Sequence, residues 1–378
     1  MKIPAAGDIA GSSWRWCAGK GAQDDFWRLT DTLCNREWCR LGGAVLNELP
    51  EEGAVAVKFR RHSRNDGTLA ELETVSGYPF GGEAEVARRI AVRDGFLDVC
   101  VDVKPGRGEI VQRLELDVLR FPGVWKSLEI VPEPPVAGEV SDRLLTVECA
   151  GEGVVWEAER PPLLMLLSDD DGGRLELGAG DDLWRLDNPG GGCRPRCTIV
   201  RDADGALALH REVLNWSDDV APERRPWRFR YYIAWSDGRK REALGDFREI
   251  ALAELPIPPE GRCGNAENGP VCWKSPAARK ILRKMLRREA ASGEKCHLSL
   301  SVAPPAVCGS AAHLERPRRG TLAHWQLTEM VEFHDWAARQ LGNRRFRMAF
   351  PERSLWSGLP SGLYLWNTPP GRAELRGE

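Results

Sequence analysis

Fifteen tryptophans against only four tyrosines, in a chain of 378 residues, are the feature that most limits what this sequence can form. Tryptophan has the largest flat apolar side chain, with a single N–H donor at its edge. Such side chains suit either a large hydrophobic core or a platform on which flat, partly apolar ligands such as sugar rings stack. The count does not choose between these uses, so the exposure of the indoles decides.

The length and composition indicate a soluble protein with more than one folded unit. A chain of 378 residues suits two domains, or one large β domain with an appendage. Hydrophobic residues make up 42% and charged residues 29%, which provides enough apolar material for a sizeable core. The net charge of −3 comes from 53 basic and 56 acidic residues. The charge balance therefore provides no broad positive field, which argues against nucleic acid as a partner.

The sequence indicates neither a membrane nor a secretory route. No apolar run approaches the roughly 20 residues of a membrane-spanning helix. The first residues, Met-Lys-Ile-Pro-Ala-Ala-Gly-Asp, lack the apolar stretch of a signal peptide. Eleven cysteines, odd in number and scattered, favour reduced thiols. We therefore predict a cytoplasmic protein with no cofactor and no membrane contact, unless a signal peptide has been removed from it.

The cysteine spacing gives no strong metal signal. The pairs closest in sequence are Cys34 with Cys39 and Cys193 with Cys197, and neither has the two-residue spacing of a zinc knuckle. Cys193 and Cys197 flank Arg-Pro-Arg after three glycines, so a turn there would bring them together. We predict no metal site, with a metal or a disulfide at Cys193 and Cys197 as the alternative.

From about Ala54 the sequence shows period-two alternation, which is typical of half-buried strands. Asp202-Ala203-Asp204-Gly205 predicts a hairpin over 198–216, because glycine supplies the positive φ that a short loop needs. Gly- and Pro-rich breaks separate the strands, and no helical pattern lies between them. This arrangement predicts an antiparallel sandwich or barrel. The alternating segments are 55–60, 97–103, 114–118, 145–149, 154–159, 198–216 and 227–235.

The pattern changes after Pro270. Ser275 followed by Pro276 predicts a helix N-cap with proline at the first helical position, and the basic side chains of this helix are predicted to form a solvated face. A second helix is predicted over 322–341, with strands near 298–302, 346–350 and 363–366. We therefore predict a mainly β chain with an N-terminal wrapping segment at 1–45, an antiparallel β-sandwich domain at 46–265 and a smaller α+β region at 266–378.

The leading candidate site comes from two strands, at 207–216 and 227–235, that each place polar side chains on one face. If these strands pair, one sheet surface carries His210, Glu212, Trp216, Arg228, Arg230 and Tyr232. An imidazole beside a carboxylate can transfer protons, so we predict His210 and Glu212 as catalytic groups. The other four are predicted to bind substrate. The alternative is a solvated outer face with weak ion pairs.

Two further groups are candidates. Asp182 and Trp184 lie in a loop where an acid could hold hydroxyls while the indole stacks on a ring, and the alternative is a tight turn with Trp184 in the core. In the late helix, Glu329 and Glu332 are neighbours on one face, followed by His334 and Asp335. Paired carboxylates of this kind serve glycoside chemistry, although surface helices carry them routinely.

No G-x-S-x-G elbow, Walker loop, H-E-x-x-H or G-x-G-x-x-G motif occurs in the sequence. Gly173-Arg-Leu-Glu-Leu-Gly178, Asp182-Leu-Trp-Arg185 and the 198–216 hairpin resemble the galactose-mutarotase-like β-supersandwich, over residues 50–260 at most. That fold occurs in sugar epimerases and as a domain of many glycoside hydrolases and polysaccharide lyases. Mutarotases use two histidines and a glutamate at the sheet face. His210 and Glu212 match two of these, and His62 is the other histidine of the β region.

The resemblance implies a carbohydrate-associated protein with a saccharide ligand. The leading hypothesis is a glycoside-processing or sugar-isomerising enzyme that acts at a polar sheet face. The alternative is a non-catalytic glycan-binding or assembly module with tryptophans as stacking platforms. The sequence does not indicate the oligomeric state.

Overall fold

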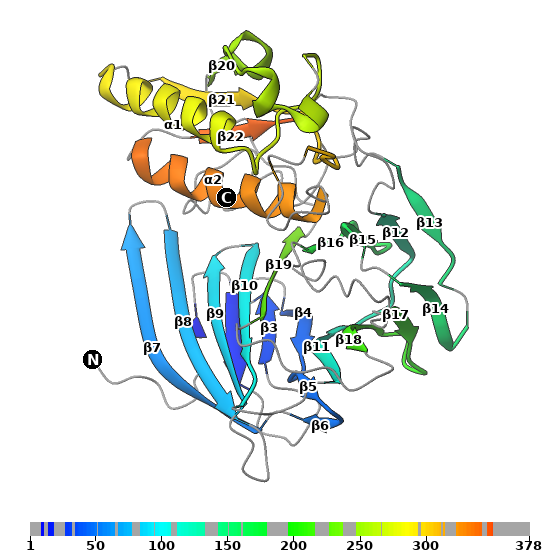
Figure 1. Cartoon of the computed structure of the whole chain (residues 1–378). Helices are drawn as coiled ribbons and strands as arrows, with labels where there is room; N and C mark the ends of the chain where they lie inside the picture. Colours follow the sequence, from blue (N-terminus) through cyan, green and yellow to red (C-terminus); the bar gives the residue numbers. More distant parts are fainter. Residues whose placement is uncertain are drawn as a thin grey trace.

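The computed structural model describes residues 9–10, 14–18, 27–31, 35–50, 52–64, 67–77, 84–93, 95–106, 112–132, 143–149, 151–159, 162–179, 196–215, 227–236, 247–265, 267–293, 296–310, 313, 323–341 and 346–350. Two large antiparallel sheets pack against each other, and a smaller unit with two helices lies beside the second sheet (Figure 1). The predicted mainly β fold with a smaller C-terminal α+β region is confirmed.

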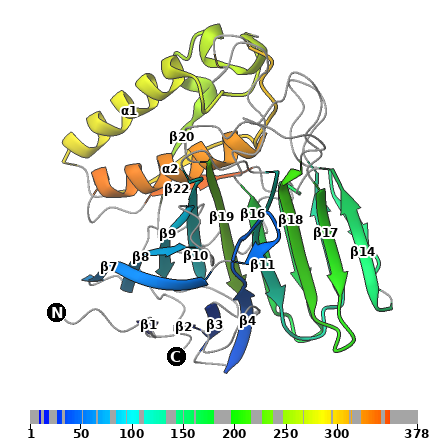
Figure 2. The ribbon, with the colours of Figure 1, turned by 60° about the horizontal axis from the view of Figure 1, so that its bottom comes forward.

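The first sheet contains the strands of the N-terminal segment at one edge and the predicted hairpin, β17 and β18, near the other (Figure 2). All its neighbouring strands are antiparallel. In spatial order they are β1 (Ile9–Ala10), β2 (Trp14–Ala18), β3 (Trp27–Asp31), β4 (Arg36–Leu41), β11 (Arg113–Phe121), β18 (Leu207–Asn215), β17 (Arg196–Arg201) and β14 (Gly153–Ala158). Short strands β5 (Val45–Leu46) and β6 (Leu49–Pro50) continue beside β11.

The second sheet is also antiparallel and has the aromatic-rich strand β19 at its centre. Its order is β13 (Leu145–Val147), β12 (Ser127–Val131), β15 (Leu164–Ser168), β16 (Arg174–Ala179), β19 (Trp227–Ser236), β10 (Phe96–Lys104), β9 (Glu85–Arg93), β8 (Gly67–Gly77) and β7 (Glu52–Arg64). One face of β19 packs against the first sheet, where Tyr231 joins the core between the sheets. The other face, which carries Tyr232, packs against the C-terminal unit.

The core between the two sheets follows the predicted alternation. The apolar residues of β10, at positions 97, 99, 101 and 103, are fully buried, and Phe229, Tyr231 and Ile233 of β19 pack with them. Trp27, Trp38, Trp125 and Trp235 belong to the same core, so these indoles serve packing and are not platforms. Burying one large apolar side chain stabilises a fold by about 1.5–3 kcal/mol, which explains how such a large sandwich is held together.

One position reverses the predicted alternation. The pattern around 114–118 places Asp117 on the solvent face of its strand, and this prediction is wrong, because Asp117 is fully buried. The register between β11 and β18 shifts between Leu116 and Leu119, where β11 has one residue more than its partner. A bulge of this kind exchanges the two faces of a strand. It turns Asp117 into the core, where the guanidinium of Arg88 meets it.

The C-terminal unit contains a parallel three-stranded sheet of β20 (Phe247–Ala251), β21 (His297–Ser301) and β22 (Phe346–Ala349). Helices α1 (Pro276–Ala291) and α2 (Ala323–Leu341) connect these strands along the chain. The predicted start of α1 is confirmed, since Pro276 begins the helix and the Ser275 hydroxyl accepts a hydrogen bond from the Ala278 N–H. The 3-10 helices η3 (Leu252–Glu254), η4 (Pro259–Gly261) and η5 (Cys263–Asn265) precede α1.

A second hydrophobic core joins the C-terminal unit to the second sheet. It combines Phe96 and Tyr232 of the sheet with apolar residues of α1, α2 and the third sheet. The predicted division near position 265 stays a prediction, and β20, which precedes it, pairs with β21, which follows it. Within the described residues, neither helix is long and apolar enough to cross a bilayer.

Candidate functional site

The structure separates the two strands that were expected to share one polar surface. Strand β18 lies between β11 and β17 in the first sheet, whereas β19 lies between β16 and β10 in the second. The predicted pairing of these strands is therefore wrong. Consecutive strands are neighbours in most sheets, but here the chain crosses from one sheet to the other. His210 and Glu212 thus belong to a different sheet from Arg228, Arg230 and Tyr232.

The His210 and Glu212 side chains take part in polar contacts on the face of the first sheet that points away from the core. His210 Nδ1 lies 2.8 Å from Glu115 Oε1, and the imidazole is 38% exposed. Glu212 accepts a hydrogen bond from Arg113, which raises the pKa of that guanidinium, and another from the Asn215 amide at 3.3 Å. The catalytic roles of His210 and Glu212 stay predictions. Trp216, Asp182 and Trp184 lie outside the described residues.

The three side chains predicted on one face of β19 do share that face, but their surroundings differ. Arg228 is exposed and donates to Asp102 at 2.6 Å. Tyr232 is only 4% exposed, its hydroxyl donates to Glu176 at 2.6 Å, and its ring stacks on Phe96. Tyr232 therefore packs between the second sheet and the C-terminal unit. The remaining side chain, Arg230, lines a pocket.

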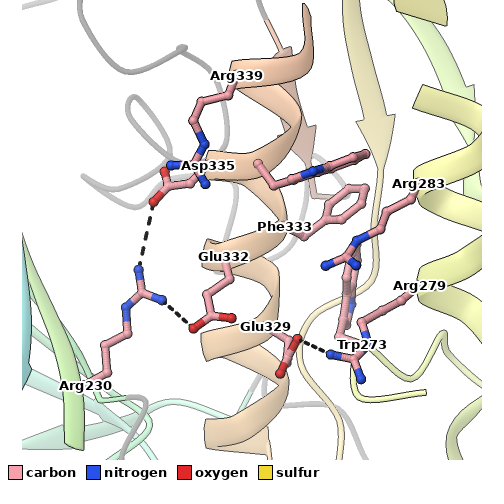
Figure 3. Close-up of a pocket in the computed structure, with 10 residues that line it drawn as sticks. Arg230, Trp273, Arg279, Arg283, Glu329, Glu332, Phe333, Asp335 and Arg339 are labelled. Atoms are coloured by element: carbon pink, nitrogen blue, oxygen red, sulfur yellow. Dashed lines mark hydrogen bonds and ion pairs between the residues drawn. The ribbon is translucent and has the colours of Figure 1, made fainter. Parts of the chain in front are cut away.

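The pocket lies where β19, α1 and α2 meet and has a volume of about 370 Å³. Arginines, carboxylates and aromatic rings line it together. Arg230 reaches from β19 toward α2, while Arg279 and Arg283 approach the same helix from α1 (Figure 3). Glu329, Glu332 and Asp335 project from α2 into the space between them. One pocket thus combines Arg230, predicted from β19, with carboxylates predicted from the late helix.

Arg230 is the most strongly engaged charge in the pocket. Its Nε and Nη2 atoms donate to the two oxygens of Asp98 at 2.9 and 2.7 Å, and Nη1 donates to Glu332 at 3.1 Å. Asp335 lies 3.9 Å from the same guanidinium. Burial acts to lower the pKa of Arg230, but the attraction of Asp98, Asp335 and Glu332 exceeds it and raises the pKa above its ordinary value. Arg230 is therefore a fixed cation.

The two glutamates predicted as a pair on the late helix both line the pocket, in different surroundings. Glu329 is mostly buried and contacts Lys274 Nζ at 3.0 Å and Arg279 Nη1 at 3.1 Å. The Glu332 side chain is 57% exposed and contacts Arg230. Glu329 is thus held between two cations, whereas Glu332 keeps a large surface toward solvent and toward a ligand. Their predicted role as paired acids stays a prediction.

Aromatic rings form the apolar part of the lining. The rings of Trp273 and Phe333 lie 5.4 Å apart, and those of Phe333 and Trp336 lie 5.8 Å apart. The guanidinium of Arg283 lies 5.5 Å from the Trp336 ring, within the range of a cation–π contact. Trp273 and Phe333 are only 3% and 6% exposed, so the partly buried Trp336 is the aromatic ring that a ligand can reach beside the charged groups.

Sequence reasoning identified part of this pocket and missed the rest. The i,i+3 spacing identified Glu329 and Glu332, and strand alternation identified Arg230. Trp273, Arg279 and Arg283 were missed as site residues, because only the packing of α1 against α2 brings them to Arg230. The basic pattern of α1 was a usable signal, although it equally describes a solvated helix face.

No family model and no curated protein matches the sequence. Among solved structures, the chain is similar to the GH36 alpha-galactosidase AgaA from Geobacillus stearothermophilus, with a TM-score of 0.47, 9% identity and coverage of 98% of this chain and 75% of that one. The alpha-galactosidase from Lactobacillus brevis gives 0.46 and 7%, with 95% and 64% covered. Heparan sulfate lyase HepC from Pedobacter heparinus gives 0.36 and 8%, with 64% and 37% covered. Similarities this low carry no conclusion about function.

Proposed function

We propose that the pocket between β19 and α2 binds a saccharide and that the chain is a carbohydrate-associated protein. The observation that carries this proposal is the lining itself, in which Arg230, Glu332 and Asp335 lie beside aromatic rings. Sugar hydroxyls donate and accept hydrogen bonds, so they suit carboxylates and guanidiniums side by side. The apolar face of a sugar ring suits the partly buried Trp336 ring. A volume of about 370 Å³ is in the range of small-ligand sites.

The charges of the lining favour binding over acid catalysis. Glycoside hydrolysis requires one carboxyl group that carries a proton to the leaving oxygen. Glu329 contacts Lys274 and Arg279, and Glu332 contacts Arg230, so cations already engage both glutamates. Oxygens held in ion pairs can still accept hydrogen bonds from sugar hydroxyls, and these contacts do not single out either glutamate as a proton donor. We therefore place saccharide binding first.

Glycoside processing is the second candidate, and the pair of glutamates on one face of α2 favours it. Glu332 is the better acid–base group of the two, because more than half of its side chain is exposed. A sugar bound beside Glu332 would place its glycosidic oxygen within reach of this carboxyl group. Glu329 would then serve as the charge-stabilising partner.

The test is saccharide binding by the full chain and by Glu332→Ala. Isothermal titration with a panel of neutral and acidic mono- and oligosaccharides should identify a ligand of the wild-type protein. Loss of one charge-assisted hydrogen bond should weaken binding about tenfold or more. Glu332 is exposed, so the substitution should leave the fold intact.

Glu157→Ala is the matched control, because Glu157 is also an exposed glutamate paired with an arginine, Arg196, and lies on β14 in the first sheet. This variant should bind saccharide as the wild type does. The proposal is wrong if no saccharide in the panel binds the wild-type chain, or if Glu332→Ala and Glu157→Ala bind equally well.

A further inference from the structure

Three cysteines that are far apart in the sequence meet inside the C-terminal unit. The Sγ atoms of Cys263, Cys272 and Cys308 all lie within 4.8 Å of one another. Their residues are 2%, 0% and 0% exposed, and Ala306 packs beside them. Sequence spacing predicted no metal site here, because these cysteines form no short motif. The cluster comes from the tertiary fold alone.

The backbone holds two of the thiols side by side. Arg262 and Val271 form an antiparallel bridge, and each precedes one of the cysteines. The Cys263 N–H donates to Pro270 O at 2.8 Å, and the Cys272 N–H donates to Gly261 O at 3.0 Å. The Arg262 guanidinium donates to Gly269 O at 2.9 Å and closes the turn. Both thiols are therefore fixed by main-chain bonds, independently of what lies between them.

A histidine completes the group. His313 is buried, and its Nδ1 atom lies 3.1 Å from the Cys308 Sγ atom. The other ring nitrogen, Nε2, contacts the carbonyl oxygen of Glu260, which can only accept a hydrogen bond, so Nε2 carries the proton. The Nδ1 lone pair then faces the Cys308 sulfur, beside the other two thiols of the cluster. A carbonyl that orients one imidazole nitrogen while the other faces sulfur is the usual outer contact of a metal-bound histidine.

The Gln326 side chain shows which groups face the sulfurs. Its Oε1 atom accepts the Trp273 N–H at 2.6 Å, so its amide nitrogen points the other way. That nitrogen donates to Cys272 Sγ at 3.1 Å and lies 3.8 Å from Cys263 Sγ. One amide N–H therefore faces two of the sulfurs, and hydrogen bonds of this kind are the usual outer contacts of metal-bound ligands.

We propose that Cys263, Cys272, Cys308 and His313 bind one structural Zn²⁺ ion. Zinc takes four tetrahedral ligands from thiolates and imidazoles, at about 2.3 Å to sulfur and about 2.0–2.1 Å to nitrogen. Thiolates on one such ion lie about 3.8 Å apart, which agrees with the upper bound of 4.8 Å between these sulfurs. Burial of the ligands leaves no open coordination position for substrate, so the ion is structural and not catalytic.

The proposed zinc site lies next to residues that form the pocket. Cys272 directly precedes Trp273, which lines the pocket, and Gln326 lies on α2 one turn before Glu329. The ion would therefore fix residues 261–265 and 267–272, together with 306–310 and His313, against the helix that carries the pocket carboxylates. Removing it should loosen α2 and lower the melting temperature of the full chain.

The experiment measures zinc in the full chain purified without chelator. Elemental analysis should find about one zinc ion per chain, and X-ray absorption at the zinc edge should show three sulfurs and one nitrogen around it. Cys272→Ser and Cys308→Ser should lose most of the zinc. Cys100→Ser is the matched control, because Cys100 is a free, half-buried cysteine of β10 outside the cluster, and this variant should keep its zinc. His313→Ala should lose the nitrogen from the zinc shell.

Several results would overturn the proposal. One is a wild-type chain without zinc, whether its three cysteines alkylate freely or mass spectrometry finds two of them in a disulfide. Another is zinc retained by both Cys272→Ser and Cys308→Ser. If the serine variants fail to fold, the absorption spectrum of the wild-type protein decides, and a shell with fewer than three sulfurs counts against the site. An unchanged nitrogen shell in His313→Ala excludes His313 as the fourth ligand.

Discussion

An arginine–carboxylate network contacts each of the two faces of β19. The two networks differ in their access to solvent. On the inner face, Tyr231 donates to Asp117 at 2.9 Å, and Arg88 pairs with the same carboxylate. On the outer face, Arg230 joins Asp98 and Glu332 at the edge of the pocket. Neighbouring residues of one strand therefore serve two networks of similar chemistry.

Burial determines what each network can do. The Arg88 and Asp117 side chains are 1% and 0% exposed, and the Arg211 guanidinium lies over the Tyr231 ring between the sheets. Burial, and then the charge of Asp117, raise the pKa of Tyr231 well above its ordinary value, so the phenol stays a donor. This closed network fixes how the sheets face each other. The outer network has exposed carboxylate surface, which a ligand can reach.

The largest effect is expected from breaking the inner network with Asp117→Asn. The substitution leaves Arg88 buried without its counter-charge, and such a loss costs about 3–5 kcal/mol of the free energy of unfolding. Urea denaturation of the full chain measures this loss. Saccharide binding at the pocket should change little in the protein that remains folded, because Asp117 lies on the other side of the sheet.

Asp102→Asn is the matched control, on the outer face of the second sheet. Asp102 pairs with the exposed Arg228 at 2.6 Å, and exposed pairs contribute about 0.2–1 kcal/mol. A loss of similar size for Asp102→Asn and Asp117→Asn would contradict the contrast between the closed and the open network.

A smaller effect is expected from Gly178→Ala on the outer face. A Cβ atom at Gly178 would lie 2.2 Å from the Tyr232 ring, which packs over this glycine. Displacing a buried ring costs about 1–3 kcal/mol, and unfolding of the variant measures the loss. Gly42→Ala is the control, because the nearest atom, Val118 Cβ, is 3.4 Å away and leaves more room. Equal stability of the two variants would show that Tyr232 does not pack against the sheet as tightly as described.

The sequence predicted the elements that depend on local pattern. Ser275 and Pro276 marked the start of α1, because capping involves only neighbouring residues. The alternation over 97–103 identified the buried face of β10, because a strand places every second side chain on one side. These signals follow from backbone geometry and hold whatever the strand later packs against.

The parts that were missed depend on contacts between distant segments. At Asp117, β11 has one residue more than its partner strand. The sequence still alternates between apolar and polar residues there, so the alternation does not reveal the bulge. Whether β18 and β19 pair depends on which sheet each joins, and both choices bury the same apolar faces. The pocket and the thiol cluster can be recognised only when the positions of α1 and α2 in the fold are known. In the pocket, for example, Arg230 and Glu332 are about a hundred positions apart in the sequence.

The smallest effect on stability is expected from His210→Ala, and this variant also tests where a reaction would take place. His210 is partly exposed and contacts Glu115, so its loss should cost about 0.2–1 kcal/mol of the free energy of unfolding. His210 lies on the first sheet and does not line the pocket, so saccharide binding should stay unchanged. If the chain hydrolyses or isomerises a sugar, His210→Ala and Glu332→Ala assign the reaction. Turnover lost in His210→Ala alone places the chemistry on the first sheet, as the sequence predicted. Turnover lost in Glu332→Ala alone places it in the pocket, because Glu332 lines the pocket and His210 does not.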